Sequence, residues 1–185
     1  MNLELKARIT EADLGTYDIN GFKFNLHKME VGSLKDFKVL LPIFNDVFEG
    51  DCFVTTTWAL TKLPGSDDPY NLCVRVVDME SVSKEDFEPS SYLKVRVAGM
   101  YLNSDKCFLR TIGVTRKPFY MATLKIKDDT GSAFPIPLVG FRNQAKKLST
   151  IKKQSIIEVE ATVKARRDGK GFELALIHAD VVHEQ

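Results

Sequence analysis

The stretch Asn143-Gln-Ala-Lys-Lys-Leu-Ser-Thr-Ile151 predicts a short helix, the only good helix candidate in the second half of the chain. A strand is predicted directly after it. From Ile157 to Ala165, apolar residues at every second position alternate with polar or charged residues from Glu158 to Arg166. This period of two is typical of a strand with one face in the core and the other in water.

Working outward, the flanking segments repeat the same pattern. Residues 120–127 alternate in the same way, and Asp128-Asp-Thr-Gly131 is a turn signal that predicts a hairpin. Arg167-Asp-Gly-Lys-Gly171 is a second turn signal between two strands. The second half is therefore predicted to run strand, strand, strand, short helix, strand, strand. This order matches the OB-fold, a small five-stranded Greek-key barrel.

The first half fits the same template. Leu5 to Ile9 echoes Leu93 to Val97, and residues 50–59 echo residues 154–163. The helix position has shrunk to about Phe44–Glu49. We therefore predict an all-β chain of two tandem OB-fold-like barrels, with a short helix in the second. An acidic domain spans residues 1–86 and a basic domain spans 92–185. The linker, 87–91, lies in a polar stretch that contains a proline.

Charge is divided unequally between the two halves. Residues 1–88 contain nine Lys and Arg against 16 Asp and Glu, a net charge of −7, whereas residues 89–185 contain 17 against nine, a net charge of +8. The whole chain has a net charge of only +1. A basic half made of short strands favours a polyanionic partner, most often nucleic acid. The acidic half favours a different partner.

The sequence gives little support for membrane, metal or enzyme chemistry. No apolar run approaches the ~20 residues that span a bilayer, and the N-terminus does not have the layout of a signal peptide. Cys52, Cys73 and Cys107 are odd in number and far apart, which favours free thiols in a reducing cytoplasm. No zinc spacing, phosphate-binding glycine loop or catalytic triad is found. We therefore expect a cytoplasmic protein with no metal, no cofactor, no membrane attachment and no catalysis.

Residues 92–185 also resemble a known group of proteins. Leu109-Arg110, then Pro118 before Tyr120-Met-Ala-Thr-Leu124, is similar to the first loop and second strand of the dimeric primosomal replication protein B. This is the closer match, and the half as a whole resembles bacterial single-stranded DNA-binding proteins. Residues 140–145 and 176–182 are similar to the third-strand exit and closing strand of the dimeric primosomal replication protein B. The resemblance implies single-strand binding without chemistry in replication, recombination or restart. The chain ends directly after its last strand, without the acidic tip of the usual binder, which favours a primosome-like variant or one of phage or mobile-element origin.

Binding a single strand needs cations for the phosphates and aromatic faces for the bases. The two hairpin loops of the basic half, which frame the binding face of an OB-fold, contain both kinds of residue. The candidate nucleic-acid-binding residues are Tyr101, Lys106, Phe108, Arg110, Arg116, Lys117, Lys125, Lys127, Lys164, Arg166, Arg167, Lys170 and Phe172. Phe119, Phe134 and Phe172 are also compatible with the core of a small barrel.

The acidic half contains the single tryptophan. Strand alternation places Val54, Trp58 and Leu60 on one outer face, where the basic half carries charged residues. An apolar stripe of this kind is usually covered. We therefore expect an interface with the other domain or with a second subunit of a homo-oligomer. The acidic charge of this half disfavours a stacked base.

Two other functions remain open at this stage. An OB-fold can serve as a protein-interaction adaptor, because fold alone does not determine function. Single-stranded RNA is recognised by the same stacking platforms as DNA. Replication or recombination proteins are candidate partners of the acidic half. A nuclease would need a metal-binding acidic cluster, and Asp128-Asp129 is better explained by the turn.

Overall fold

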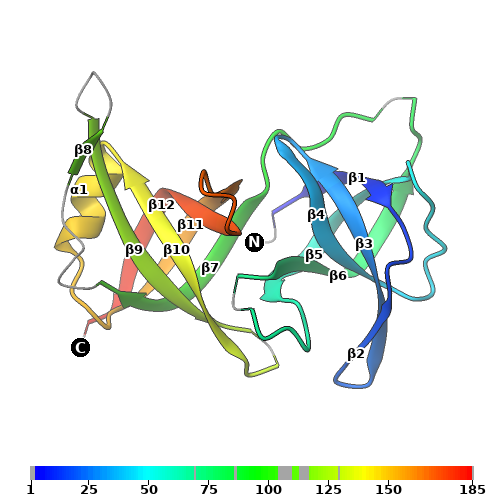
Figure 1. Ribbon diagram of the computed structural model, residues 1–185, viewed down its shortest axis with the longest axis horizontal. Coiled ribbons are helices and arrows are strands. Elements are labelled where there is room, and N and C mark those ends of the chain that lie inside the picture. The colour runs from blue at the N-terminus through cyan, green and yellow to red at the C-terminus, as the bar shows by residue number, and fades with distance from the viewer. Residues whose placement is uncertain are drawn as a thin grey trace. The chain divides into compact units, whose positions relative to one another are not determined.

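Two β-barrels follow one another along the chain in this computed structural model (Figure 1). The structure describes residues 3–68, 70–85, 87–103, 110–112, 117–128 and 130–184. Internal contacts divide the chain into two compact units, residues 1–93 and 94–185. No helix in the described part of the chain is long and apolar enough to cross a membrane.

The first unit is a barrel closed by the pairing of β1 with β3. Its strands are β1 (Leu5–Glu11), β2 (Thr16–Ile19), β3 (Phe22–Val31), β4 (Leu34–Pro42), β5 (Cys52–Lys62) and β6 (Leu72–Val82). They are ordered β1-β5-β6-β4-β3-β2, and the additional β1–β3 pairing completes the ring. β4 and β6 are parallel, whereas the other neighbours are antiparallel. β2 only extends the ladder of β3.

The second unit repeats this topology strand for strand. It contains β7 (Lys94–Leu102), β8 (Arg110–Ile112), β9 (Lys117–Lys127), β10 (Ala133–Phe141), α1 (Asn143–Thr150), β11 (Ile156–Ala165) and β12 (Phe172–His183). The order is β10-β12-β11-β7-β9-β8, closed by β10–β9, and β10 and β12 are parallel. A five-stranded ring with this order is an OB-fold. The prediction of two tandem OB-like barrels is confirmed.

The helix forms where the sequence predicts it. Ala145 and Leu148 of α1 are fully buried, so one face of the helix is part of the barrel core. The Tyr101 hydroxyl donates to the Leu148 carbonyl at 2.6 Å, which satisfies one of the last helical carbonyls. A Cβ at Gly140 would lie 2.8 Å from the Gln144 backbone, so the glycine permits this close packing. Residues 43–51, at the same place in the first unit, contain no helix.

Burial follows the predicted alternation in the second unit. On β11, Ile157 and Val159 are fully buried, whereas Glu158 is exposed. β9 alternates in the same way, with Leu124 in the core and Lys125 in solvent. Burying each large aliphatic side chain contributes about 1.5–3 kcal/mol, so a shift of one residue in either strand would be strongly opposed.

Candidate nucleic-acid interface

The outer face of β9 carries the basic side chains that the sequence analysis selected. Met121, Lys125 and Lys127 all point into solvent, with Met121 41% exposed. Their inward neighbours Ala122 and Ile126 are buried, which fixes the orientation of the whole row. This row is called the β9 track below.

An aromatic pair lies at the start of the β9 track. Phe119 is directly opposite Phe141 in the β9–β10 ladder, and their ring centroids are 5.4 Å apart at an interplanar angle of 51°. Phe141 is 39% exposed, so part of a ring faces solvent and offers a surface on which a base can stack. Sequence reasoning missed Phe141. Counting back along both strands from the turn at residues 128–132 gives this pairing, so the signal was present in the hairpin register.

The turn between β11 and β12 supplies the second basic group. Arg166 is held inside the turn, where its Nη2 lies 2.8 Å from Asp168 Oδ2 and its backbone N–H donates to the Gly171 carbonyl at 3.0 Å. Arg167 and Lys170 are exposed on the same turn. The internal ion pair shapes the turn, and the other two cations face solvent.

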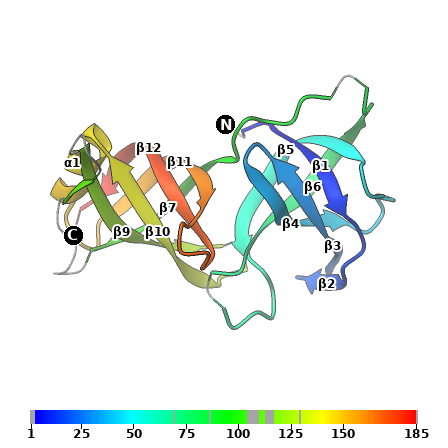
Figure 2. The same ribbon diagram turned by 45° about the horizontal axis from the view of Figure 1, so that its top comes forward.

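Strand registers place this turn at the same end of the barrel as Lys125 and Lys127. Leu138 of β10 pairs with Ala122 on one side and with Leu174 on the other. Because β10 and β12 are parallel, the beginning of β12 lies level with Leu124 on β9. Figures 1 and 2 show the β9–β10 and β11–β12 turns at one end of this barrel. The β9 track therefore runs from the aromatic pair at one end toward two basic turn residues at the other.

Five of the cations that the sequence analysis selected form no ion pair with a described residue: Lys125, Lys127, Lys164, Arg167 and Lys170. Glu173 pairs with Lys164 in the ladder. Partial burial raises the pKa of the Glu173 carboxyl, and the nearby charges of Arg166 and Lys164 oppose the shift. Mild acid therefore makes this face more positive.

The first unit differs in this respect. Arg8 lies 3.2 Å from Glu30 and Lys28 lies 2.7 Å from Glu11, in each case as an ion pair. On β3, the strand equivalent to β9, His27 points away from solvent at 1% exposure. The described residues of β3 therefore form no row of unpaired cations like the β9 track.

Several predicted site residues lie elsewhere. Tyr101 was wrongly placed in a polar loop: it is a fully buried residue of β7, because its hydroxyl finds a partner in the C-terminal turn of α1. Phe134 is a core residue and Phe172 is half-buried. Arg110 lies on β8 and Lys117 lies on β9. The remaining candidates, Lys106, Phe108 and Arg116, lie outside the described residues.

The predicted apolar stripe on β5 is interrupted by a bulge. The register with β6 shifts between Val54 and Thr57 and again between Thr57 and Trp58. Leu60 is consequently turned into the core at 5% exposure, so its prediction as an outer-face residue is wrong. The Trp58 indole Nε1–H donates to the Leu3 carbonyl at 2.7 Å, within the first unit. An interface role for Val54 and Trp58 stays a prediction.

Within the described ranges, no three or more His, Cys, Asp or Glu side chains are arranged to hold a metal ion. The geometry thus defines a class: a tandem OB-fold chain whose second barrel carries a partly exposed aromatic pair and a row of cations without ion pairs to described residues.

Comparison with known proteins agrees with this fold. No protein-family model matches the chain, and no curated protein sequence matches it. The solved wild-type single-stranded DNA-binding protein from Thermus aquaticus matches over 100% of this chain and 94% of its own, with a TM-score of 0.67 at 12% identity. A deletion mutant of that protein covers 100% and 96%, with a TM-score of 0.68 at 10% identity. PriB from Ralstonia solanacearum matches 48% of this chain and 96% of its own, with a TM-score of 0.40 at 11% identity. The chain therefore resembles the Thermus aquaticus protein in fold.

Proposed function

We propose that this chain is a non-catalytic single-stranded DNA-binding protein whose second barrel holds the strand. The observation that carries the proposal is the β9 track, where exposed cations without ion pairs to described residues continue from a partly exposed aromatic pair. Cations bind the phosphates of a single strand, and aromatic rings stack on its bases irrespective of sequence. The likeness in fold to a single-stranded DNA-binding protein supports the same function.

The two units divide the work in this proposal. The second unit binds DNA during replication, recombination or restart, and the first unit assembles copies or contacts partner proteins. The charges of −7 and +8 in the two halves support this division, because a negative surface repels phosphate at low salt. A cytoplasmic location and a phage or mobile-element origin belong to the same hypothesis.

The test is a fluorescence anisotropy titration of labelled oligo-dT with the full chain at several salt concentrations. We expect saturable binding that weakens steeply with salt, and much weaker binding of a duplex of equal length. Absence of saturable binding at low salt would overturn the proposal in favour of an adaptor. Tighter binding of oligo-rU than of oligo-dT would reassign the site to RNA, since stacking platforms accept both.

Trp58 provides an internal reporter for the division of labour. It lies on β5 of the first unit, whereas the β9 track belongs to the second unit. Saturating oligo-dT should therefore leave its fluorescence nearly unchanged. Strong quenching that saturates together with the anisotropy signal would place the strand on the first barrel.

A further inference from the structure

The segment that follows β6 is built into the first unit. The Lys6 backbone N–H donates to Ser90 Oγ at 2.9 Å, and the Ser90 N–H donates back to the Lys6 carbonyl at 3.0 Å. A Cβ on Gly32 would lie only 2.0 Å from the Ser91 carbonyl oxygen, so the segment passes directly over this glycine. These contacts hold residues 87–91, which the sequence predicted as a linker, against the outer side of the barrel.

Phe87 makes this segment the wall of a pocket. Its ring is half-buried, and the Arg8 guanidinium carbon lies 5.8 Å from the ring centroid. Arg8 is itself fixed by its ion pair with Glu30. A cation over an aromatic face is attracted to the electron-rich ring, which favours one position of the ring. The contact with Arg8 therefore favours the position in which Phe87 forms this wall.

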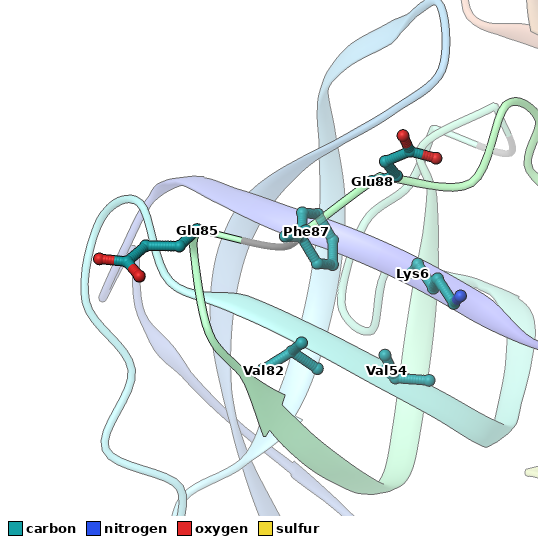
Figure 3. Close-up of a pocket in the computed structure, with 6 residues that line it drawn as sticks. All are labelled: Lys6, Val54, Val82, Glu85, Phe87 and Glu88. Atoms are coloured by element: carbon teal, nitrogen blue, oxygen red, sulfur yellow. The ribbon is translucent and has the colours of Figure 1, made fainter.

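The pocket beneath Phe87 has a mostly polar lining, with an apolar floor formed by Val54 and Val82. It has a volume of about 640 Å³ and is lined by Lys6, Val54, Val82, Glu85, Phe87 and Glu88. Figure 3 shows Val82 and Val54 on neighbouring strands on one side of the pocket, with Phe87 opposite them and Glu85 and Lys6 at its two ends. This volume is within the range of small-ligand sites, about 300–1,000 Å³.

The rim of the pocket is negatively charged. The carboxylates of Glu85 and Glu88 are exposed and form no ion pair with any described residue. The one cation of the lining, Lys6, already lies 3.4 Å from Glu4. An anionic ligand such as a nucleic acid would be repelled here, whereas a Lys or Arg side chain would find unpaired carboxylates.

We infer that this pocket binds a short basic segment of a partner protein. One apolar side chain of the segment sits between Phe87 and the two valines, and flanking Lys or Arg residues pair with Glu85 and Glu88. Charge complementarity selects this occupant, because the pocket combines an apolar floor with a net negative rim. The pocket belongs to the first unit and the β9 track to the second, so the two sites share no residue.

The test uses the full 15N-labelled chain and the synthetic peptide acetyl-Gly-Lys-Leu-Lys-Gly-amide. We expect saturable shifts in the NMR signals of Val54, Val82 and Phe87. The peptides acetyl-Gly-Lys-Gly-Lys-Gly-amide, without the apolar anchor, and acetyl-Gly-Glu-Leu-Glu-Gly-amide, with reversed charge, should each cause much smaller shifts at these residues.

Matched variants distinguish binding at this pocket from attraction of a basic peptide to the overall negative charge of the first unit. The double variant Glu85→Gln/Glu88→Gln should weaken peptide binding about 3- to 10-fold, as expected for two exposed ion pairs. Asp46→Asn/Glu49→Gln changes the charge of the same unit equally but away from the lining, and should leave the affinity unchanged.

A nearly isosteric change, Val82→Thr, tests the apolar floor and should weaken only the leucine-containing peptide. Peptide shifts that map away from the pocket, or equal binding by the Glu85→Gln/Glu88→Gln variant, would overturn the inference. Shifts at the pocket caused by oligo-dT would overturn it in favour of nucleic acid. Loss of strand binding with retained peptide binding would contradict only the proposed function.

Discussion

Neutralising the β9 track by Lys125→Gln/Lys127→Gln should change the salt dependence of strand binding by a calculable amount. Five of the cations selected as binding residues have no ion pair with a described residue, and two of them, Lys125 and Lys127, are on β9. If each of the five neutralises one phosphate, the slope of log affinity against log salt is about −3.5, at about 0.7 per contact. Removing two contacts should reduce the slope to about −2.1. A fourfold increase in salt would then weaken binding about 18-fold in the variant, compared with about 130-fold in the unaltered chain.

The assay is an anisotropy titration of labelled oligo-dT at four or more salt concentrations. The matched control is Lys23→Gln/Lys35→Gln, which removes two exposed lysines from the first unit and changes the net charge equally. Its slope should stay near that of the unaltered chain. A Lys125→Gln/Lys127→Gln slope within error of the unaltered value, or an equal loss in the control, would refute the assignment of the strand to the β9 track.

Three further measurements follow from the structure. Phe141→Ala removes the exposed ring of the aromatic pair and should weaken oligo-dT binding by about 1–3 kcal/mol, with little change in melting temperature; unchanged affinity in the anisotropy assay would exclude stacking at this ring. Gly32→Ala should lower the free energy of urea unfolding by more than the ~1–2 kcal/mol of a left-handed alanine, because the added Cβ also meets the Ser91 carbonyl. The control Gly65→Ala has φ +75° and open space around its Cβ, so it should lose only the strain energy. Equal losses in the two variants would mean that residues 87–91 move aside freely. Burial lowers the pKa of His27 below 6.5, so the unfolded chain binds more protons than the folded chain in mild acid. The free energy of unfolding should therefore fall as the pH drops below about 6.5. A His27→Gln variant with the same pH dependence of unfolding would show that His27 is not its cause.

The sequence alone predicts the features that depend on residues close together in the chain or on the composition of each half. The period of two on β9 and β11 determines which side chains are buried, because successive residues of a strand point to opposite faces. The short helix and the order of strands around it identify the barrel, and the division of charge points to the second unit. These are properties of neighbouring residues or of summed composition, so the sequence contains them directly.

Other features were decided by contacts between distant residues. Tyr101 is in the core because the helix brings the Leu148 carbonyl to its hydroxyl, 47 positions along the chain. Leu60 is turned inward because a bulge in β5 changes the phase of the alternation.

The pairing of two partly exposed phenylalanines and the pocket under Phe87 likewise depend on tertiary structure. Phe119 and Phe141 meet because two strands lie in one register, and the pocket exists because residues 87–91 fold back over β1. The alternation of a single strand cannot specify these features, because a bulge, a cross-strand pair or a returning segment is fixed only when both partners are in place.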